Sequence, residues 1–186
     1  MLKKISGTFN AWAKGWLVIV LFVLDGFFVG LLLPVVEALL KSDSGGPGPI
    51  DLQFFYAPVK VFEMIAAYGP YGRPFYRNVE LTVDIIYPIV YTLFLGLLIS
   101  WLFQRGFQPG HKIQKWNVVP LGAWFFDLLE NIGIVILISV FPATPAALTW
   151  ITNFFSLSKW FFVFLSIGLV VVGLLNAARN KFRKQV

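Results

Sequence analysis

The chain contains no cysteine and a single histidine, His111, among its 186 residues. The lack of cysteine excludes disulfides, a thiol nucleophile and cysteine-ligated iron–sulfur clusters. His111 follows Pro109 and Gly110 in a turn-rich stretch, which is typical of a solvated loop residue. A haem or a histidine-based metal site is therefore not expected, and we expect the protein to work without a metal or cofactor.

Charged residues are also scarce. They make up 13% of the chain, whereas hydrophobic residues make up 58%. A soluble domain has about 25% charged and about 45–50% apolar residues. This composition predicts an integral membrane protein. The length allows one compact bundle, so we expect a single transmembrane domain over residues 1–186.

Four apolar runs are long enough to cross a bilayer, which takes roughly 20 helical residues. They cover residues 16–40, 79–103, 118–141 and 146–178. The predicted fold is therefore all-α, an integral membrane four-helix bundle. The link from Pro142 to Pro145 is so short that the third and fourth helices must form an antiparallel hairpin.

The long connection over residues 41–78 is predicted to lie on the outer side of the membrane. Within it, Pro58 to about Tyr68 predicts a short amphipathic helix. The apolar residues that would share one face of this helix are Val59, Phe62, Ile65 and Ala66. We expect such a helix to lie on the membrane surface or to cap the bundle.

Acidic residues are missing from three basic segments, which precede the first run, separate the second and third, and follow the fourth. Their basic residues are Lys3, Lys4, Lys14, Arg105, Lys112, Lys115, Arg179, Lys181, Arg183 and Lys184. This positive-inside pattern predicts that both termini are cytoplasmic, and we expect a multi-pass protein of a bacterial inner membrane. Topology thus explains the net charge of +6, and no nucleic-acid partner is expected.

Ionisable residues inside the apolar runs carry the strongest functional signal, because each costs on the order of 3 kcal/mol at mid-membrane. Asp127, Glu130 and Asn131 share one face of the third run, and Asp25 lies in the first. The second and fourth runs each carry a polar stripe at helical spacing. These stripes are Glu80, Asp84, Tyr87 and Tyr91, and Thr149, Asn153, Ser156 and Lys159. We expect them to face one another in one polar cluster.

This cluster predicts a binding pocket for a lipid-like or isoprenoid small molecule. The predicted ligand-binding residues are Asp25, Asp84, Tyr87, Tyr91, Asn131, Asn153 and Lys159. Trp124, Trp150 and Trp160 could line such a pocket with the two tyrosines and would favour a cation. If the protein is an enzyme, Asp127 and Glu130 would be the acid and base of an isomerase or cyclase acting on a lipophilic alkene.

Two other interpretations remain open. The polar side chains could simply hydrogen-bond the helices together, in an accessory or structural subunit of a larger membrane complex or in a homo-oligomer. Near the outer surface, Arg73 and Arg77 could bind lipid headgroups or pair with Glu80. Gly26 and Gly30 have the G-x-x-x-G spacing that favours close helix approach.

Two resemblances extend these expectations. The layout resembles the EXPERA group, with Leu24-Asp25-Gly26 and Leu33-Pro34 in the first run and Glu80-Leu81 in the second. This likeness implies binding of sterols or cationic amphiphiles and, for some members, sterol isomerisation.

The chain is also similar to small uncharacterised bacterial four-helix membrane proteins. The shared features are Gly72-Arg73 through Tyr76, Asp84 through Pro88, Asp127 through Asn131, and the late intramembrane Lys159. This second likeness covers the last two-thirds of the chain and implies no known activity.

Overall fold

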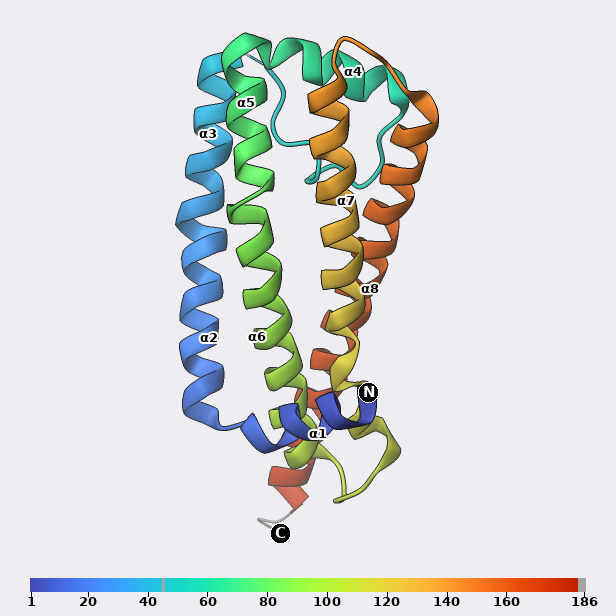
Figure 1. The fold of residues 1–186 in the computed structure, drawn as a ribbon. Helices are drawn as coiled ribbons and strands as arrows, with labels where there is room; N and C mark the ends of the chain where they lie inside the picture. Colours follow the sequence, from blue (N-terminus) through green and yellow to red (C-terminus); the bar gives the residue numbers. More distant parts are fainter. Residues whose placement is uncertain (45, 184–186) are drawn as a thin grey trace.

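The computed structural model describes residues 1–44 and 46–183 and is built of helices joined by short turns (Figure 1). Within this described part, four helical stretches are long and apolar enough to cross a membrane. They are Gly15–Ser42, Gly69–Gly106, Lys112–Val140 and Ala146–Arg183. The prediction of an all-helical chain with four long apolar helices is confirmed. The stretches run past the predicted boundaries, because each apolar run continues as helix into its polar flanks.

The first span is a composite of three helical segments, α2 (Gly15–Phe27), η1 (Phe28–Leu32) and α3 (Leu33–Ser44). The middle segment, η1, is a π-helical turn, in which the Leu33 N–H bonds to the Phe28 carbonyl. This span packs along α5 (Gly69–Glu80) and α6 (Val83–Gly106). Before it, α1 (Leu2–Trp12) lies across the end of the bundle that holds both termini (Figure 1).

The second span begins earlier than its apolar run, with α5 (Gly69–Glu80) leading into α6 (Val83–Gly106) through a break at Leu81 and Thr82. Residues 69–78 were expected in the outer loop because they hold two glycines and two prolines. Pro70 is compatible with this helix because it falls in the first turn, where its missing N–H costs nothing, and Pro74 is accommodated in the helix interior. Gly69 turns the chain from the preceding helix, α4 (Pro58–Ala67), with a φ of 66°, which glycine adopts without strain.

A hairpin of two helices forms the other half of the bundle. A 3-10 turn, η2 (Lys112–Val118), leads into α7 (Pro120–Val140), and α8 (Ala146–Arg183) returns antiparallel to it. Gly122 and Gly133 allow this close approach, because an added Cβ would collide with the side chains of Phe162 and Thr152, respectively. In contrast, Gly26 and Gly30 face open space, so the G-x-x-x-G spacing mediates no close packing within the described chain.

The predicted short helix is present as α4 (Pro58–Ala67), which lies over the end of the bundle opposite the termini (Figure 1). Its buried residues are Val61, Met64 and Ile65, which pack in one apolar cluster with Ile134 and neighbouring residues of α7. Val59 was expected on the packed face but is 70% exposed. The helix therefore packs on the bundle through a face rotated from the predicted one.

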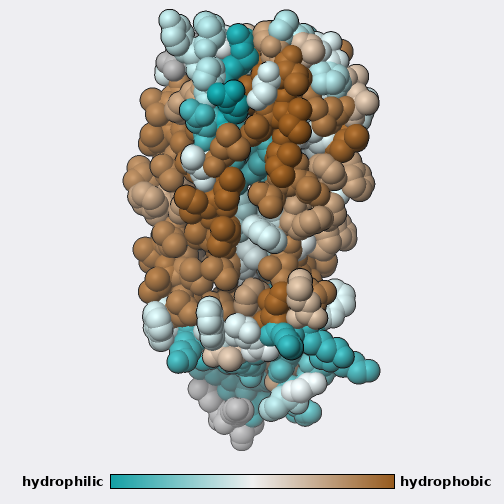
Figure 2. Space-filling model, in the orientation of Figure 1, coloured by the Kyte–Doolittle hydropathy of each residue, from teal (hydrophilic) through white to brown (hydrophobic). Residues whose placement is uncertain are grey.

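The two ends of the bundle differ in charge, and its side is apolar. A broad hydrophobic belt separates two hydrophilic ends (Figure 2). Met1 and Arg183, the last described residue of α8, lie at one end, together with the described residues of the basic segments identified in the sequence (Figure 1). This agrees with the even number of candidate spans, while the side of the membrane that each end faces stays a prediction.

Candidate ligand-binding site

A cavity of about 350 Å³ lies inside the bundle, walled by the first span, α5, α6, α7 and α8. Its lining is mostly apolar and includes the carboxylates of Asp25, Asp51, Asp84 and Asp127 and the ammonium of Lys159. Its aromatic side chains are Tyr76, Tyr87, Tyr91, Phe94 and Trp160. Acidic residues predicted from three separate apolar runs therefore meet around one cavity.

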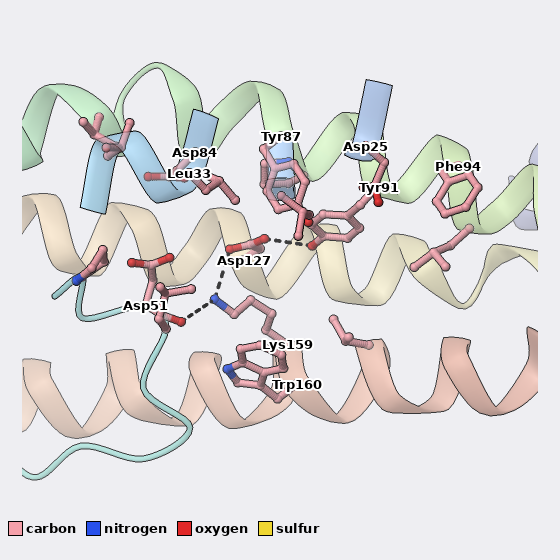
Figure 3. A pocket seen from close by; sticks show the side chains of 18 of the residues that line it. Asp25, Leu33, Asp51, Asp84, Tyr87, Tyr91, Phe94, Asp127, Lys159 and Trp160 are labelled. Atoms are coloured by element: carbon pink, nitrogen blue, oxygen red, sulfur yellow. Dashed lines mark hydrogen bonds and ion pairs between the residues drawn. The ribbon is translucent and has the colours of Figure 1, made fainter. Parts of the chain in front are cut away.

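Lys159 is the cation of this site, and it is surrounded by acceptors. Its Nζ lies 2.6 Å from Glu130 Oε2 and 3.4 Å from Asp127 Oδ1. It also donates to the Asp51 carbonyl at 3.1 Å (Figure 3). Only 8% of the Lys159 side chain is exposed. The Lys159 ammonium is thus already paired with neighbouring groups of the protein.

Two tyrosines complete the hydrogen bonding of these carboxylates. Tyr91 donates to Asp127 Oδ2 at 2.8 Å, and Tyr56 donates to Glu130 Oε1 at 3.2 Å. Burial, with the adjacent Glu130 carboxylate, raises the pKa of the Tyr56 hydroxyl well above its usual range, so it stays a donor. Asp127 lines the cavity, whereas Glu130 is fully buried and contacts Tyr56 and Lys159 instead.

The segment that joins α3 to α4, residues 46–57, dips between the helices and forms a re-entrant strap (Figure 1). The deepest contact of the strap is with Lys159. This residue lies 13 residues into α8, which corresponds to a depth of about 20 Å from the start of that helix. Non-helical backbone at membrane depth is tolerated only where protein groups satisfy its hydrogen bonds.

The polar stripe of α8 satisfies part of the strap. Asn153 accepts from the Tyr56 amide at 2.9 Å, Ser156 donates to the Gln53 carbonyl at 3.3 Å, and Lys159 binds the Asp51 carbonyl. Successive positions of the stripe therefore bind successive positions of the strap in antiparallel order.

From the opposite side, the Tyr76 hydroxyl of α5 accepts from the Ile50 amide at 2.8 Å and donates to Asp51 Oδ1 at 2.7 Å. Tyr68 donates to the Gly48 carbonyl at 2.9 Å. The strap is thus fastened to two walls of the bundle, and its residues Pro49, Asp51 and Leu52 close the cavity at that end.

Asp25 and Asp84 differ from the other carboxylates. Both line the cavity, yet within the described residues neither side chain has a hydrogen bond or an ion pair that would satisfy it (Figure 3). Asp25 Oδ1 is buried without a partner. Asn131 donates to the backbone carbonyl of Asp84 at 2.6 Å, which leaves the Asp84 carboxylate unbound.

Other residues expected at the site lie elsewhere. Asn131 and Asn153 bond to the backbone of α6 and of the strap, and they hold these elements in place. Trp160 lines the cavity, whereas Trp150 is 48% exposed and contacts the Phe55 ring in a tilted arrangement. Trp124 is half-buried in α7, outside the lining.

The two arginines of α5, at the end of the bundle near α4, are placed differently from each other. The Arg73 guanidinium stacks over Phe141 at 4.4 Å from the ring centroid and bonds to the Ile65 carbonyl. Arg77 is exposed, and its binding of a lipid headgroup stays a prediction. Glu80 is buried, and its two oxygens find no hydrogen-bond partner among the described residues, so it is not paired with either arginine.

Three residues that shape the site were not predicted as site residues from the sequence. They are Asp51, Tyr56 and Tyr76. All three lie in the segment predicted as an outer loop, where nothing in the local pattern shows that the chain turns back into the bundle. One signal was present, since the α8 stripe offers more hydrogen-bonding groups than one facing helix can satisfy.

The described part of the site shows no set of metal-ligating side chains. Among the described residues, no group of three histidine, cysteine, aspartate or glutamate side chains is placed to hold a metal ion. Comparison with protein-family models, with curated proteins and with solved structures finds no match to this chain.

Proposed function

We propose that this protein binds a lipid-like or isoprenoid small molecule in the cavity, with a positively charged group of that molecule near Asp25 and Asp84. The observation that carries the proposal is the state of these two carboxylates, which face an apolar cavity without a partner. Asp25 Oδ1 is buried and Asp84 is half-buried, and an ionised group held away from water without a partner is costly. A bound cation would remove that cost.

Charge and size support this choice of ligand. Lys159 is engaged by Asp127, Glu130 and the strap, so it is not free to neutralise Asp25 and Asp84. A volume of about 350 Å³ falls within the usual range of small-molecule sites, about 300–1,000 Å³. Apolar side chains of the first span and α8 suit an aliphatic chain, and Tyr87 and Trp160 suit the face of a cation.

The geometry favours binding over acid–base chemistry. Asp127 and Glu130, the two residues expected to act in an isomerase or cyclase, are both paired with Lys159. Asp127 also accepts from Tyr91, and Glu130 lies outside the cavity lining. A general acid must reach the atom it protonates. Binding is therefore the function that this arrangement supports best.

The test uses native mass spectrometry of the purified protein with dodecylamine and dodecanol, which differ only in their head group. We expect the amine to bind more tightly by roughly 10- to 100-fold, the range of a charge-assisted hydrogen bond. The double variant Asp25→Asn/Asp84→Asn should lose this preference. The matched control Glu63→Gln changes an exposed carboxylate on α4 and should keep it.

Extraction from the native membrane gives a second readout. A stoichiometric small apolar molecule that is lost in the double variant would support the proposal. Equal binding of amine and alcohol by wild type would refute the cationic group. Protein partners retained without any small molecule would favour the alternative of an accessory subunit.

A further inference from the structure

We infer that the ligand reaches the cavity from the lipid bilayer, through a lateral gap between the first span and α8. This inference rests on the proposed function and adds the class of ligand source, which is a molecule dissolved in the membrane. The cavity is closed less firmly on the side of this gap than at the end toward the strap.

The first span is attached to the rest of the bundle along one side only. It packs on α5 and α6 and, in the described chain, makes no extensive contact with α7 or α8. Only 11% of the residues in its most apolar window are buried, compared with 50% for the second span. Yet residues of both the first span and α8 line the cavity.

The two edges of this gap are apolar. Val29 and Leu33 line the cavity from the first span, and Val163 and Ile167 line it from α8. Ile167 is 47% exposed and Val29 is 51% exposed, so both also lie on the outer surface of the bundle. Side chains that belong both to a cavity and to the lipid-facing surface mark the place where the two are continuous.

The end of the cavity toward the strap is closed more firmly. Lys159, Ser156 and Tyr76 hold the strap backbone over this end through hydrogen bonds. A ligand arriving from water would have to break these bonds, whereas a ligand arriving from lipid would displace only other apolar chains.

The helix geometry of the first span is irregular at the level of the cavity. The π-helical turn η1 contains Val29 and Gly30, and both Gly30 and the preceding Gly26 face open space. A π-helical turn interrupts the regular hydrogen-bond pattern and recurs at functional sites. Phe28 in the same turn stacks on Tyr87 at 5.4 Å, which ties this turn to α6 near the cavity. Outward movement of the first span at this turn would widen the gap, while α3 would keep its packing beside the strap, where Val36 and Leu40 share an apolar cluster with Ile50.

Cross-linking tests the route directly, because the chain has no cysteine of its own. The lateral pair is Leu33→Cys/Val163→Cys, and the strap pair is Leu52→Cys/Val79→Cys. Each variant is reconstituted in lipid nanodiscs, loaded with dodecylamine and closed with a bismaleimide. Release into empty vesicles is then followed by native mass spectrometry. Because all four positions line the cavity, the release rate of each variant after cross-linking is compared with the rate of the same variant before cross-linking.

We expect the lateral cross-link to slow release by at least about tenfold, since a closed gate limits exchange. The strap cross-link should leave the release rate unchanged. Slower release only with the strap pair, or no change with the lateral pair and with a second lateral pair, Val29→Cys/Ile167→Cys, would overturn the inference. Failure of the proposed function looks different, because dodecylamine would then not bind even before cross-linking.

Discussion

Replacement of Lys159 by methionine is the sharpest perturbation of this bundle. Methionine keeps much of the apolar stem of lysine but removes the ammonium that lies 2.6 Å from Glu130 and 3.4 Å from Asp127. Two carboxylates then remain buried together without a cation. Removing one member of a buried ion pair costs about 3–5 kcal/mol. We expect Lys159→Met to lower the free energy of unfolding by that amount.

A triple variant tests whether the loss of stability comes from the two unpaired carboxylates. In Lys159→Met/Asp127→Asn/Glu130→Gln the uncompensated charges are gone, and the new amide oxygens can still accept from Tyr91 and Tyr56. Replacing a whole buried ionic cluster is often close to neutral, so we expect the triple variant to regain at least about 2 kcal/mol over Lys159→Met. Two extra substitutions would thus stabilise a destabilised protein.

The assay is reversible unfolding in mixed micelles, followed by the loss of helical circular dichroism. The matched control is Lys60→Met, whose ammonium lies 4.0 Å from Glu63 with both side chains 64% exposed. A surface pair of this kind contributes about 0–1 kcal/mol. If Lys159→Met cost no more than Lys60→Met, or if the triple variant were less stable than Lys159→Met, the ionic brace would be refuted.

Three other predictions concern the strap, the helix hairpin and the topology. Tyr76→Phe removes the hydroxyl that accepts from the Ile50 amide, so hydrogen exchange at that amide should speed up, with a loss of about 1–3 kcal/mol that the exposed control Tyr71→Phe should not show. Gly133→Ala would press a methyl group into Thr152 and should destabilise by about 1–3 kcal/mol. The control Gly168→Ala, which meets open space, should be neutral or stabilising, and equal melting temperatures would contradict this packing. A single cysteine at Lys60 should react with an impermeant maleimide outside intact cells and one at Lys112 should not, whereas the reverse pattern would invert the predicted orientation.

The sequence determined the helices well, because the physics that sets them is local. An apolar run of 20 residues can satisfy its backbone in lipid only as a helix, so composition and length were sufficient to predict four long apolar helices. Extra helix at residues 69–78 was missed, since two glycines and two prolines suggest a turn unless the prolines fall in a helix that packing supports.

The location of the site could be predicted in part. Buried polar residues at helical spacing show that a face needs partners, and Asp25, Asp84, Tyr87, Tyr91, Asp127 and Lys159 do meet around one cavity. Spacing along a helix does not reveal which partner each residue finds. Asn131 and Asn153 follow the same stripes, yet they bond to backbone groups.

Only the tertiary structure decided how the polar residues divide between strap and cavity. The α8 stripe binds strap atoms that lie 97 to 108 positions away in the chain, a separation that local pattern cannot encode. Because the Lys159 ammonium is engaged in that contact, the Asp25 and Asp84 carboxylates face the cavity without a partner. The charge and hydrogen-bonding capacity of each polar group are set by its residue type. Whether that group is free to bind a ligand depends on which distant groups folding brings within hydrogen-bond reach.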